Sequence, residues 1–470
     1  MKGVALRYIS TRGQSPALSF EEVLLAGLAP DGGLYVPQEY KTFTPDEIRK
    51  MRGLSYPELA AEVMAPFTEG CLSKHDLTEL ARDAYASFAH AAVAPLKQVR
   101  EGLWVMELYH GPTLAFKDYA LQMVGRMFDK VLDRRGKRIT IVGATSGDTG
   151  SAAIEACKNC RNLDIFILHP HNRVSEVQRR QMTTTMSRNV FNIALEGTFD
   201  DCQSLVKAMF ADTAFREKYS LSAVNSINWA RISAQIVYYF YAALALGAPD
   251  RPVSFAVPTG NFGNIFAGYV AKKMGLPIKT LVLGSNANDI LPRFMETGVM
   301  EKKEVVPSIS PSMDIQVSSN FERLLFEVCG RDAKAVTGWM ETFKYERKYV
   351  VPQEILSKIR EIFSGFRCDD DETRRAIREM YEASGEICDP HGAIGFKAGE
   401  AFLEKGVPMV VLATAHPAKF PVAVREAIGV SPKLPSSLSD LLTRRESFTV
   451  LPNRFESVTY YIDSCVGKGA

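Results

Sequence analysis

Short apolar runs alternate with amphipathic stretches over most of the chain after residue 100. The runs have the length and the β-branched content of buried strands, and most of the stretches between them have helical spacing. Because alternating strands and helices are typical of a mainly parallel sheet with both faces covered, the pattern predicts an α/β fold. The expected strands span residues 103–108, 139–144, 164–169, 190–195, 253–258, 278–284 and 408–413.

Residues before about 95 have a different, mainly helical pattern. Ser19, Thr44, Ser55 and Ser73 each precede a candidate helix, and Thr44 is followed by a proline and two acidic residues, which favour a first turn. Since one hydrophobic core rarely grows beyond roughly 250–300 residues, a chain of 470 residues predicts two or three domains. Residues 300–370 have uneven periodicity, and we interpret them as an elaboration of the larger domain.

The overall composition argues against several classes of protein. Hydrophobic residues make up 46% and charged residues 23% of the chain, and the formal net charge is +2. We therefore expect no nucleic-acid partner and no membrane partner. The longest uncharged stretch, 232–249, contains three tyrosines, a serine and a glutamine, which indicates a buried helix and not a membrane span. The N-terminal end lacks the apolar run of a secretory signal.

The eight cysteines are scattered, and Cys157 and Cys160 form the one close pair. A structural zinc site would need a second such pair, so we expect no metal site. We interpret these two thiols as lying one turn apart on a helix. Unpaired cysteines fit a reducing cytoplasm.

Two polar, glycine-containing loops follow expected strands. Glycines let the backbone approach a ligand closely, and exposed amides at a helix start bind anions. Neither loop has the lysine of a P-loop or the G-x-G-x-x-G pattern of a dinucleotide site. We therefore expect phosphate or carboxylate binding; the alternative is a tight turn needed only for packing. The loops are residues 145–151 and 259–264.

Lys117 follows the first expected strand and a Gly-Pro turn, and it stands at the start of an expected helix. Apolar neighbours and the helix dipole should both lower the pKa of its amine, which favours a nucleophile. The alternative is an ordinary lysine with a buried stem and an exposed charge. Its position alone supports the two interpretations about equally.

Together, these segments resemble those of threonine synthases in their longer form, which has an extra N-terminal domain. The resemblance covers nearly the whole chain. HGPTLAFKDYALQ is similar to the segment that carries the cofactor lysine in that family, whereas the glycine-rich loops are shared by fold-type II pyridoxal-phosphate enzymes in general. GPTLAFKD, NSINWARI and TAHPAKF are the more specific segments. The other similar segments are YISTRG, DGGLYVP, ATSGDTGSAA, PTGNFGN and DPHGAIG.

The resemblance implies a fold and its division into domains. The implied fold is that of a fold-type II pyridoxal-phosphate enzyme, with two open, mainly parallel sheet domains flanked by helices and an N-terminal, mostly helical domain. The N-terminal domain would span residues 1–95. The large cofactor-binding domain would comprise residues 96–130 and 215–470, with a small α/β domain, residues 131–214, inserted in it.

The resemblance also implies roles for individual residues. Lys117 would hold pyridoxal 5'-phosphate and act in catalysis, and Thr414 would meet the pyridine nitrogen. Asp148 would contact the cofactor, at a position where related enzymes have asparagine. The residues implied for the cofactor phosphate are Gly260, Asn261, Phe262, Gly263 and Asn264. Those implied for the substrate are Thr145, Ser146 and Thr149 at its carboxylate and, as candidates, Asn225, Ser226, Asn228 and Arg231 at its phosphate. His416 and Lys419, beside Thr414, are explained as well by a satisfied polar network as by catalysis.

The implied reaction converts O-phospho-L-homoserine and water to L-threonine and phosphate by γ-elimination and β-addition of water, the last step of threonine biosynthesis. We expect a monomer or a homodimer in the cytoplasm. The alternatives are another fold-type II enzyme, such as a dehydratase or a phospholyase, a regulatory protein that lacks the chemistry, and a nucleotide-binding protein. The lysine, the two loops and Arg231 argue against the regulatory protein, and the missing nucleotide motifs argue against the last alternative.

Overall fold

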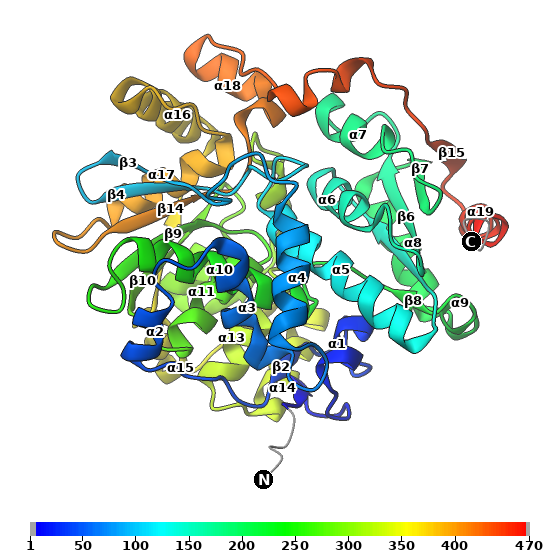
Figure 1. Cartoon of the computed structure of the whole chain (residues 1–470), viewed down its shortest axis with the longest axis horizontal. Helices are drawn as coiled ribbons and strands as arrows, with labels where there is room; N and C mark the ends of the chain where they lie inside the picture. Colours follow the sequence, from blue (N-terminus) through cyan, green and yellow to red (C-terminus); the bar gives the residue numbers. More distant parts are fainter. Residues whose placement is uncertain (1–5, 467–470) are drawn as a thin grey trace.

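The computed structural model describes residues 6–466 and contains two open β-sheets with helices packed against them (Figure 1). The larger sheet has the strand order β13-β10-β9-β14-β4-β3. Its neighbouring strands are parallel except β3, which is antiparallel to β4. The strands of this sheet are β3 (Leu96–Arg100), β4 (Leu103–Glu107), β9 (Val253–Pro258), β10 (Ile278–Ser285), β13 (Phe363–Arg367) and β14 (Met409–Ala413).

The smaller sheet has the order β15-β7-β6-β5-β8, and all of its pairs are parallel. Its strands are β5 (Ile139–Ala144), β6 (Leu163–Pro170), β7 (Val190–Glu196), β8 (Leu221–Ser222) and β15 (Thr449–Pro452). All seven strands expected from the apolar runs are present in the two sheets, which confirms the α/β prediction.

The helices after residue 100 mostly lie between strands in sequence. They are α5 (Lys117–Arg135), α6 (Asp148–Cys157), α7 (Glu176–Thr183), α8 (Phe199–Ala211), α9 (Thr213–Lys218), α10 (Trp229–Ala245), α11 (Gly263–Lys273), α12 (Ile290–Thr297), α13 (Phe321–Val328), α14 (Ala333–Glu346), α15 (Gln353–Arg360), α16 (Asp370–Ser384), α17 (Pro390–Ala401), α18 (Pro421–Ile428) and α19 (Phe455–Cys465). Short 3-10 helices span Pro311–Met313 (η2), Pro417–Lys419 (η3), Ser436–Leu438 (η4) and Leu441–Thr443 (η5), and β11 (Val299–Glu301) pairs with β12 (Lys348–Val350).

Alternate side chains of the central strands pack against different helix layers. On β14, Val410 and Leu412 belong to the main core, which includes residues of α10 and α11. Met409 and Val411 instead join a second cluster with residues of α16 and α17. Because successive side chains of a strand point to opposite faces, this division means that helices cover both faces of the larger sheet. Continuous apolar runs are therefore needed at the strand positions.

Two parts of the chain depart from the domain boundaries implied by the resemblance. The range 215–470 contains β8 and β15, and both strands pair with the smaller sheet. α19, which follows β15, also packs there, because Val458 and Ile462 share a cluster with residues of β6 and β7. Figure 1 shows the C-terminal segment crossing from α18, beside the larger sheet, to α19, beside the smaller one.

The N-terminal segment is mostly helical and shares its core with the larger sheet domain. The hydroxyls of Ser19, Thr44 and Ser73 accept hydrogen bonds from the third amide of the helix that follows, which confirms these predicted helix starts. Trp229 of α10 packs against the rings of Tyr8 and Phe67. The elements are β1 (Tyr8–Ser10), α1 (Phe20–Ala26), β2 (Tyr35–Pro37), α2 (Pro45–Lys50), α3 (Tyr56–Met64), η1 (Ala65–Phe67) and α4 (Lys74–Tyr85).

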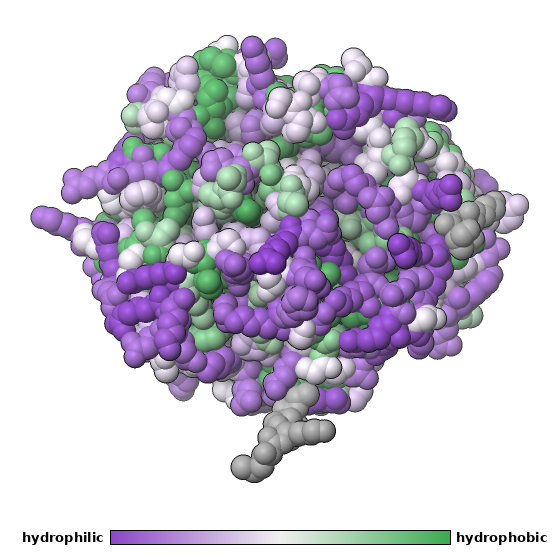
Figure 2. Space-filling model, in the orientation of Figure 1, coloured by the Kyte–Doolittle hydropathy of each residue, from purple (hydrophilic) through white to green (hydrophobic). Residues whose placement is uncertain are grey.

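Three further expectations concern single segments. The uncharged stretch 232–249 forms most of the buried helix α10, as predicted, and no helix within residues 6–466 is long and apolar enough to cross a membrane. Polar residues cover most of the face drawn in Figure 2. The expectation for the close cysteine pair was wrong in part, because α6 ends at Cys157 and Cys160 lies in the turn that follows. The expectation about a secretory signal concerns in part residues 1–5, which lie outside the described residues.

Candidate active site

The loop between β4 and α5 delivers Lys117 to the carboxyl edge of the larger sheet. The amide of Phe116 donates to the Thr414 carbonyl (2.8 Å), and the amide of His416 donates to the Leu114 carbonyl (3.0 Å). These bonds hold the loop beside the segment that follows β14. Lys117 is the first residue of α5, and only 13% of its side chain is exposed. In open parallel sheets, ligands bind at this edge.

The Lys117 amine faces a carboxylate in a buried setting. Its Nζ lies 3.5 Å from Asp148 Oδ2. Burial lowers the pKa of Lys117, the charge of Asp148 opposes that shift, and the charges of Lys419 and Arg231 add to it. The direction of this shift confirms the pKa prediction, and it is the one that a nucleophilic amine requires.

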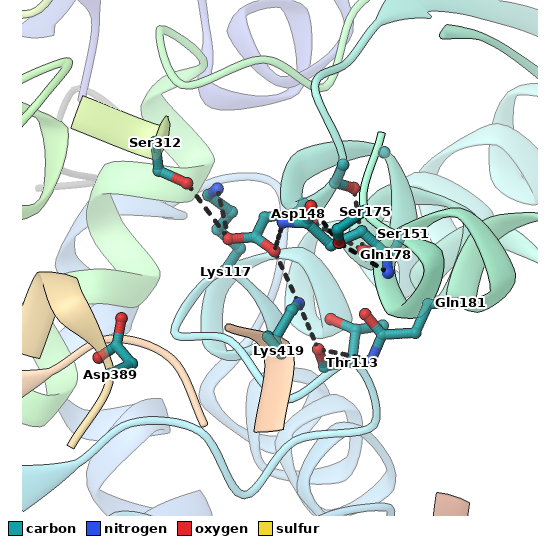
Figure 3. A network of polar contacts seen from close by, with 12 residues as sticks. Thr113, Lys117, Asp148, Ser151, Ser175, Gln178, Gln181, Ser312, Asp389 and Lys419 are labelled. Carbon is teal, nitrogen blue, oxygen red and sulfur yellow. Dashed lines mark hydrogen bonds and ion pairs between the residues drawn. The ribbon is translucent and has the colours of Figure 1, made fainter. Parts of the chain in front are cut away.

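Asp148 lies at the centre of a polar network that joins the two sheets (Figure 3). Its Oδ1 lies 2.7 Å from Lys419 Nζ and accepts from Gln178 Nε2 at 2.8 Å. Its Oδ2 accepts from the Ser312 hydroxyl at 3.3 Å. Burial alone would raise the pKa of Asp148, but the charges of Lys419 and Lys117 bring it well below its usual range. The carboxylate is therefore ionised.

In the first glycine-containing loop, residues 145–151, the Thr145 side chain binds backbone amides of the same loop. The Thr145 hydroxyl oxygen accepts from the amides of Gly147 (3.0 Å) and Gly150 (2.9 Å). A Cβ at Gly150 would lie 2.4 Å from Thr145 Cγ2, so only glycine fits. Among the described residues, the amides of Ser146, Asp148 and Thr149 have no acceptor. Three free amides at the start of α6 form a candidate anion site, with the Thr145 oxygen engaged in shaping it.

The second loop, residues 259–264, presents a longer row of free amides. Within the part of the chain that the structure describes, the amides of residues 260–264 have no acceptor. Phe262 has a φ of +61°, which turns the chain into α11. Asn264 Oδ1 accepts from the hydroxyls of Tyr238 (2.6 Å) and Tyr239 (3.0 Å), while its buried Nδ2 has no partner. Successive amides and an unpaired amide group suit a phosphate.

The candidate residues between Asn225 and Arg231 are placed differently from one another. Arg231 is buried, its Nη1 donates to the Val224 carbonyl (2.9 Å), and its Nε has no acceptor. Burial lowers the pKa of Arg231 to about 10. Asn225 is exposed and Ser226 is half-buried. An unpaired guanidinium nitrogen close to Lys117 can bind an oxyanion.

Asn228, another candidate for the substrate phosphate, makes its hydrogen bonds within the fold. Its Oδ1 accepts from the Ala230 amide (3.0 Å) as the cap of α10, and its Nδ2 donates to the Leu24 carbonyl (2.9 Å). Both polar atoms of this fully buried side chain thus make hydrogen bonds within the fold.

Thr414 and His416 flank the site from the end of β14. Thr414 is buried, and its carbonyl is bonded to the residue that precedes Lys117. His416 Nδ1 accepts from the Ala418 amide (3.1 Å). Burial, reinforced by the nearby His110, lowers the pKa of His416 to about 4, so its ring is neutral at neutral pH.

Sequence reasoning missed three residues of the network. Gln178 and Ser312 both donate to Asp148, although they stand 30 and 164 residues away from it in the chain. Gln181 donates to the Thr113 carbonyl at 3.0 Å. No local pattern marks these residues, because only the fold brings them together. Groups of three or more side chains suited to a metal ion are absent among residues 6–466.

Comparison with known families accounts for most of the chain. Models of the threonine synthase N terminus, of pyridoxal-phosphate dependent enzymes and of the threonine synthase C-terminal region match residues 7–85, 90–342 and 392–462. A threonine synthase of Pseudomonas aeruginosa is 57% identical over 466 residues, which cover 99% of each chain.

Solved structures agree with these matches. A structure of PLP-bound threonine synthase from Brucella melitensis superposes with a TM-score of 0.97 at 56% identity, covering 98% of this chain and 100% of that one. Yeast threonine synthase superposes with a TM-score of 0.93 at 39% identity over 99% of both chains. This chain belongs to the threonine synthase family of pyridoxal-phosphate-dependent enzymes.

Proposed function

We propose that this chain converts O-phospho-L-homoserine and water to L-threonine and inorganic phosphate, with pyridoxal 5'-phosphate bound to Lys117. The observation that carries this proposal is the buried Lys117 amine, which stands beside an ionised carboxylate at the carboxyl edge of the larger sheet, in a chain of the threonine synthase family. The reaction is a γ-elimination of phosphate followed by β-addition of water.

The residues present fit this cofactor. The free amides of residues 260–264 and the unpaired Asn264 Nδ2 offer donors for its phosphate. Lys117 offers a nitrogen for its aldehyde, and Thr414 offers a neutral hydroxyl for its pyridine nitrogen. When bound, pyridoxal phosphate withdraws electrons from an attached amino acid and makes the protons on its α and β carbons removable.

The chain's own residues perform the remaining tasks. The Lys117 amine takes protons from, and returns protons to, the α and β carbons, which its lowered pKa favours. The free amides of Ser146, Asp148 and Thr149 orient the substrate carboxylate. Arg231, with Asn225 and Ser226, binds the phosphate group that leaves.

Product analysis tests the proposal directly. The purified protein is incubated with O-phospho-L-homoserine, and threonine, phosphate and keto acid are measured together. We expect threonine and phosphate in equal amounts and no keto acid. In separate incubations with serine or threonine, keto acid as the main product would instead identify a dehydratase.

Variants of two lysines on the same helix sharpen this test. Lys117→Ala should abolish turnover and the visible absorbance of the bound cofactor. Lys130→Ala, in the second half of α5, removes a partly exposed lysine that pairs with Asp76, and it should leave both unchanged. Turnover by the Lys117 variant would contradict the proposal.

We further propose a reducing, cytoplasmic location and a monomer or homodimer. All eight cysteines are free thiols, which fits a reducing compartment. Light scattering of the purified protein measures the assembly.

A further inference from the structure

Lys419 is a second buried lysine in the site, and its amine contacts two oxygen atoms. It ends η3, and its side chain is fully buried. Its Nζ lies 2.7 Å from Asp148 Oδ1 and donates to the Thr113 carbonyl at 2.8 Å. A buried ammonium is stable only when it is paired and hydrogen-bonded. Figure 3 shows Lys419 reaching Asp148 from the side opposite Ser312.

Asp148 therefore faces two ammonium groups at unequal distances. Lys419 Nζ is at 2.7 Å from one oxygen and Lys117 Nζ is at 3.5 Å from the other. Since the Coulomb interaction strengthens as the separation falls, Lys419 offsets more of the carboxylate charge than Lys117 does.

This division of charge matters for the Lys117 nitrogen. A lone carboxylate 3.5 Å away would stabilise the charged form of that nitrogen and keep its proton in place. Lys419 opposes this effect, because its positive charge lies against the same carboxylate and disfavours a second cation nearby. The positive charge of Arg231 also lowers the pKa of Lys117. The other charged or titratable groups facing Lys419 are Asp118 and His416.

We propose that Lys419 is a positioning residue that holds Asp148 ionised and oriented and offsets its charge, so that the Lys117 nitrogen can release its proton in the working pH range. The inference rests on the proposed function in one respect, namely that Lys117 carries the cofactor. A merely structural Lys419 would tie the Thr113 loop to Asp148 without affecting the Lys117 nitrogen.

A pH titration of the holoenzyme separates these roles. The visible absorbance of the cofactor bound at Lys117 reports the pH at which the Lys117 nitrogen loses its proton. Removing the cation in Lys419→Met should raise this midpoint by about 1 pH unit or more. Removing the carboxylate in Asp148→Asn should lower it. The double variant lacks both charges, and its midpoint should return toward that of the unmodified enzyme.

A matched control removes a lysine from an exposed ion pair. Lys279 pairs with Glu404 on the surface, and Lys279→Met should leave the midpoint unchanged. A midpoint in Lys419→Met equal to that of this control would overturn the inference while leaving the proposed function intact. An unmodified enzyme without a Lys117-dependent band would overturn the proposed function and this inference with it.

The double variant also allows the inference to be tested if Lys419→Met does not fold. Lys419→Met leaves a buried carboxylate without its main partner, which is destabilising, whereas Asp148→Asn/Lys419→Met removes both charges of the Asp148–Lys419 pair. If Lys419→Met does not fold, the double variant is compared with Asp148→Asn. A higher midpoint in the double variant supports the inference, and identical midpoints overturn it.

Discussion

Thr113 binds both carboxylate oxygens of Asp118: its amide donates to Oδ2 at 2.8 Å, and its hydroxyl donates to Oδ1 at 2.6 Å. Asp118 follows Lys117 in sequence and is fully buried. Burial raises the pKa of Asp118 to about 6, although the bonds from Thr113 oppose this rise. The pair closes the loop that leads into Lys117, and it makes that loop sensitive to pH.

The stability of the fold should therefore depend on Asp118 between pH 4 and pH 6. The folded carboxyl takes up its proton near pH 6 and an unfolded one near pH 4. Ionised Asp118 thus opposes folding above pH 6, and the opposition is relieved as the pH falls toward 4. In Asp118→Asn this pH dependence should vanish. Relative to that variant, the unmodified protein should gain on the order of 2 to 3 kcal/mol between pH 7 and pH 4, measured by urea unfolding. Parallel stability curves would contradict this.

Gly260 should be required for tight cofactor binding. A Cβ there would lie 2.9 Å from the Ser312 carbonyl oxygen, which is backbone and cannot move aside freely. Gly260→Ala should displace the phosphate loop and weaken the affinity for pyridoxal phosphate at least about tenfold, or roughly 1.4 kcal/mol, in a titration of cofactor-free enzyme. Gly338→Ala is the control, because nothing lies within 4 Å of a Cβ at that position on α14. Equal affinities for the two variants would argue against the phosphate role of this loop.

Arg231 should determine the affinity for the phosphate group of the substrate. Its free Nε makes it the one candidate in the 225–231 segment with an unpaired buried donor among the described residues. Arg231→Lys keeps a positive charge but loses the planar fork, so we expect KM for O-phospho-L-homoserine to rise about tenfold or more. Inhibition by inorganic phosphate should weaken in parallel. An unchanged KM together with a lowered kcat would place the phosphate elsewhere.

Asn228 should affect stability and not substrate binding. Asn228→Ala removes the cap of α10 and the bond to the Leu24 carbonyl, at a cost of about 1 to 2 kcal/mol. Thermal unfolding should shift to a lower temperature, while KM should remain that of the unmodified enzyme. A raised KM without loss of stability would instead support a role for Asn228 in binding the substrate phosphate.

The strands that sequence reasoning found are the ones whose two faces are both buried. Every residue of β9 and β14 is buried, and a continuous apolar run of strand length is the result. The strands it missed lie at sheet edges. β13 and β15 have half-buried and exposed positions, and the apolar signal is correspondingly diluted. The boundaries implied by the resemblance also leave β15 outside the smaller domain, although it pairs with β7.

The candidate site likewise contains residues that a local sequence pattern marks and residues that no such pattern marks. Lys117 and the two loops are marked locally, by a lysine or glycines at a strand-to-helix turn. The environment of Asp148 is not marked, because its partners come from α7, η2 and η3. Lys419 is close to Thr414 in sequence, but its burial against Asp148 depends on the fold of both sheets. The cap position of Asn228 could have been suspected, since asparagine before a helix is a common cap.

The central claim is that Lys117 carries pyridoxal phosphate, and reductive trapping tests it most directly. The holoenzyme is treated with borohydride, digested and analysed by mass spectrometry. The account predicts one peptide with the mass of the reduced cofactor, with the modified residue at Lys117. Modification at Lys419, or at any other lysine in place of Lys117, would contradict it.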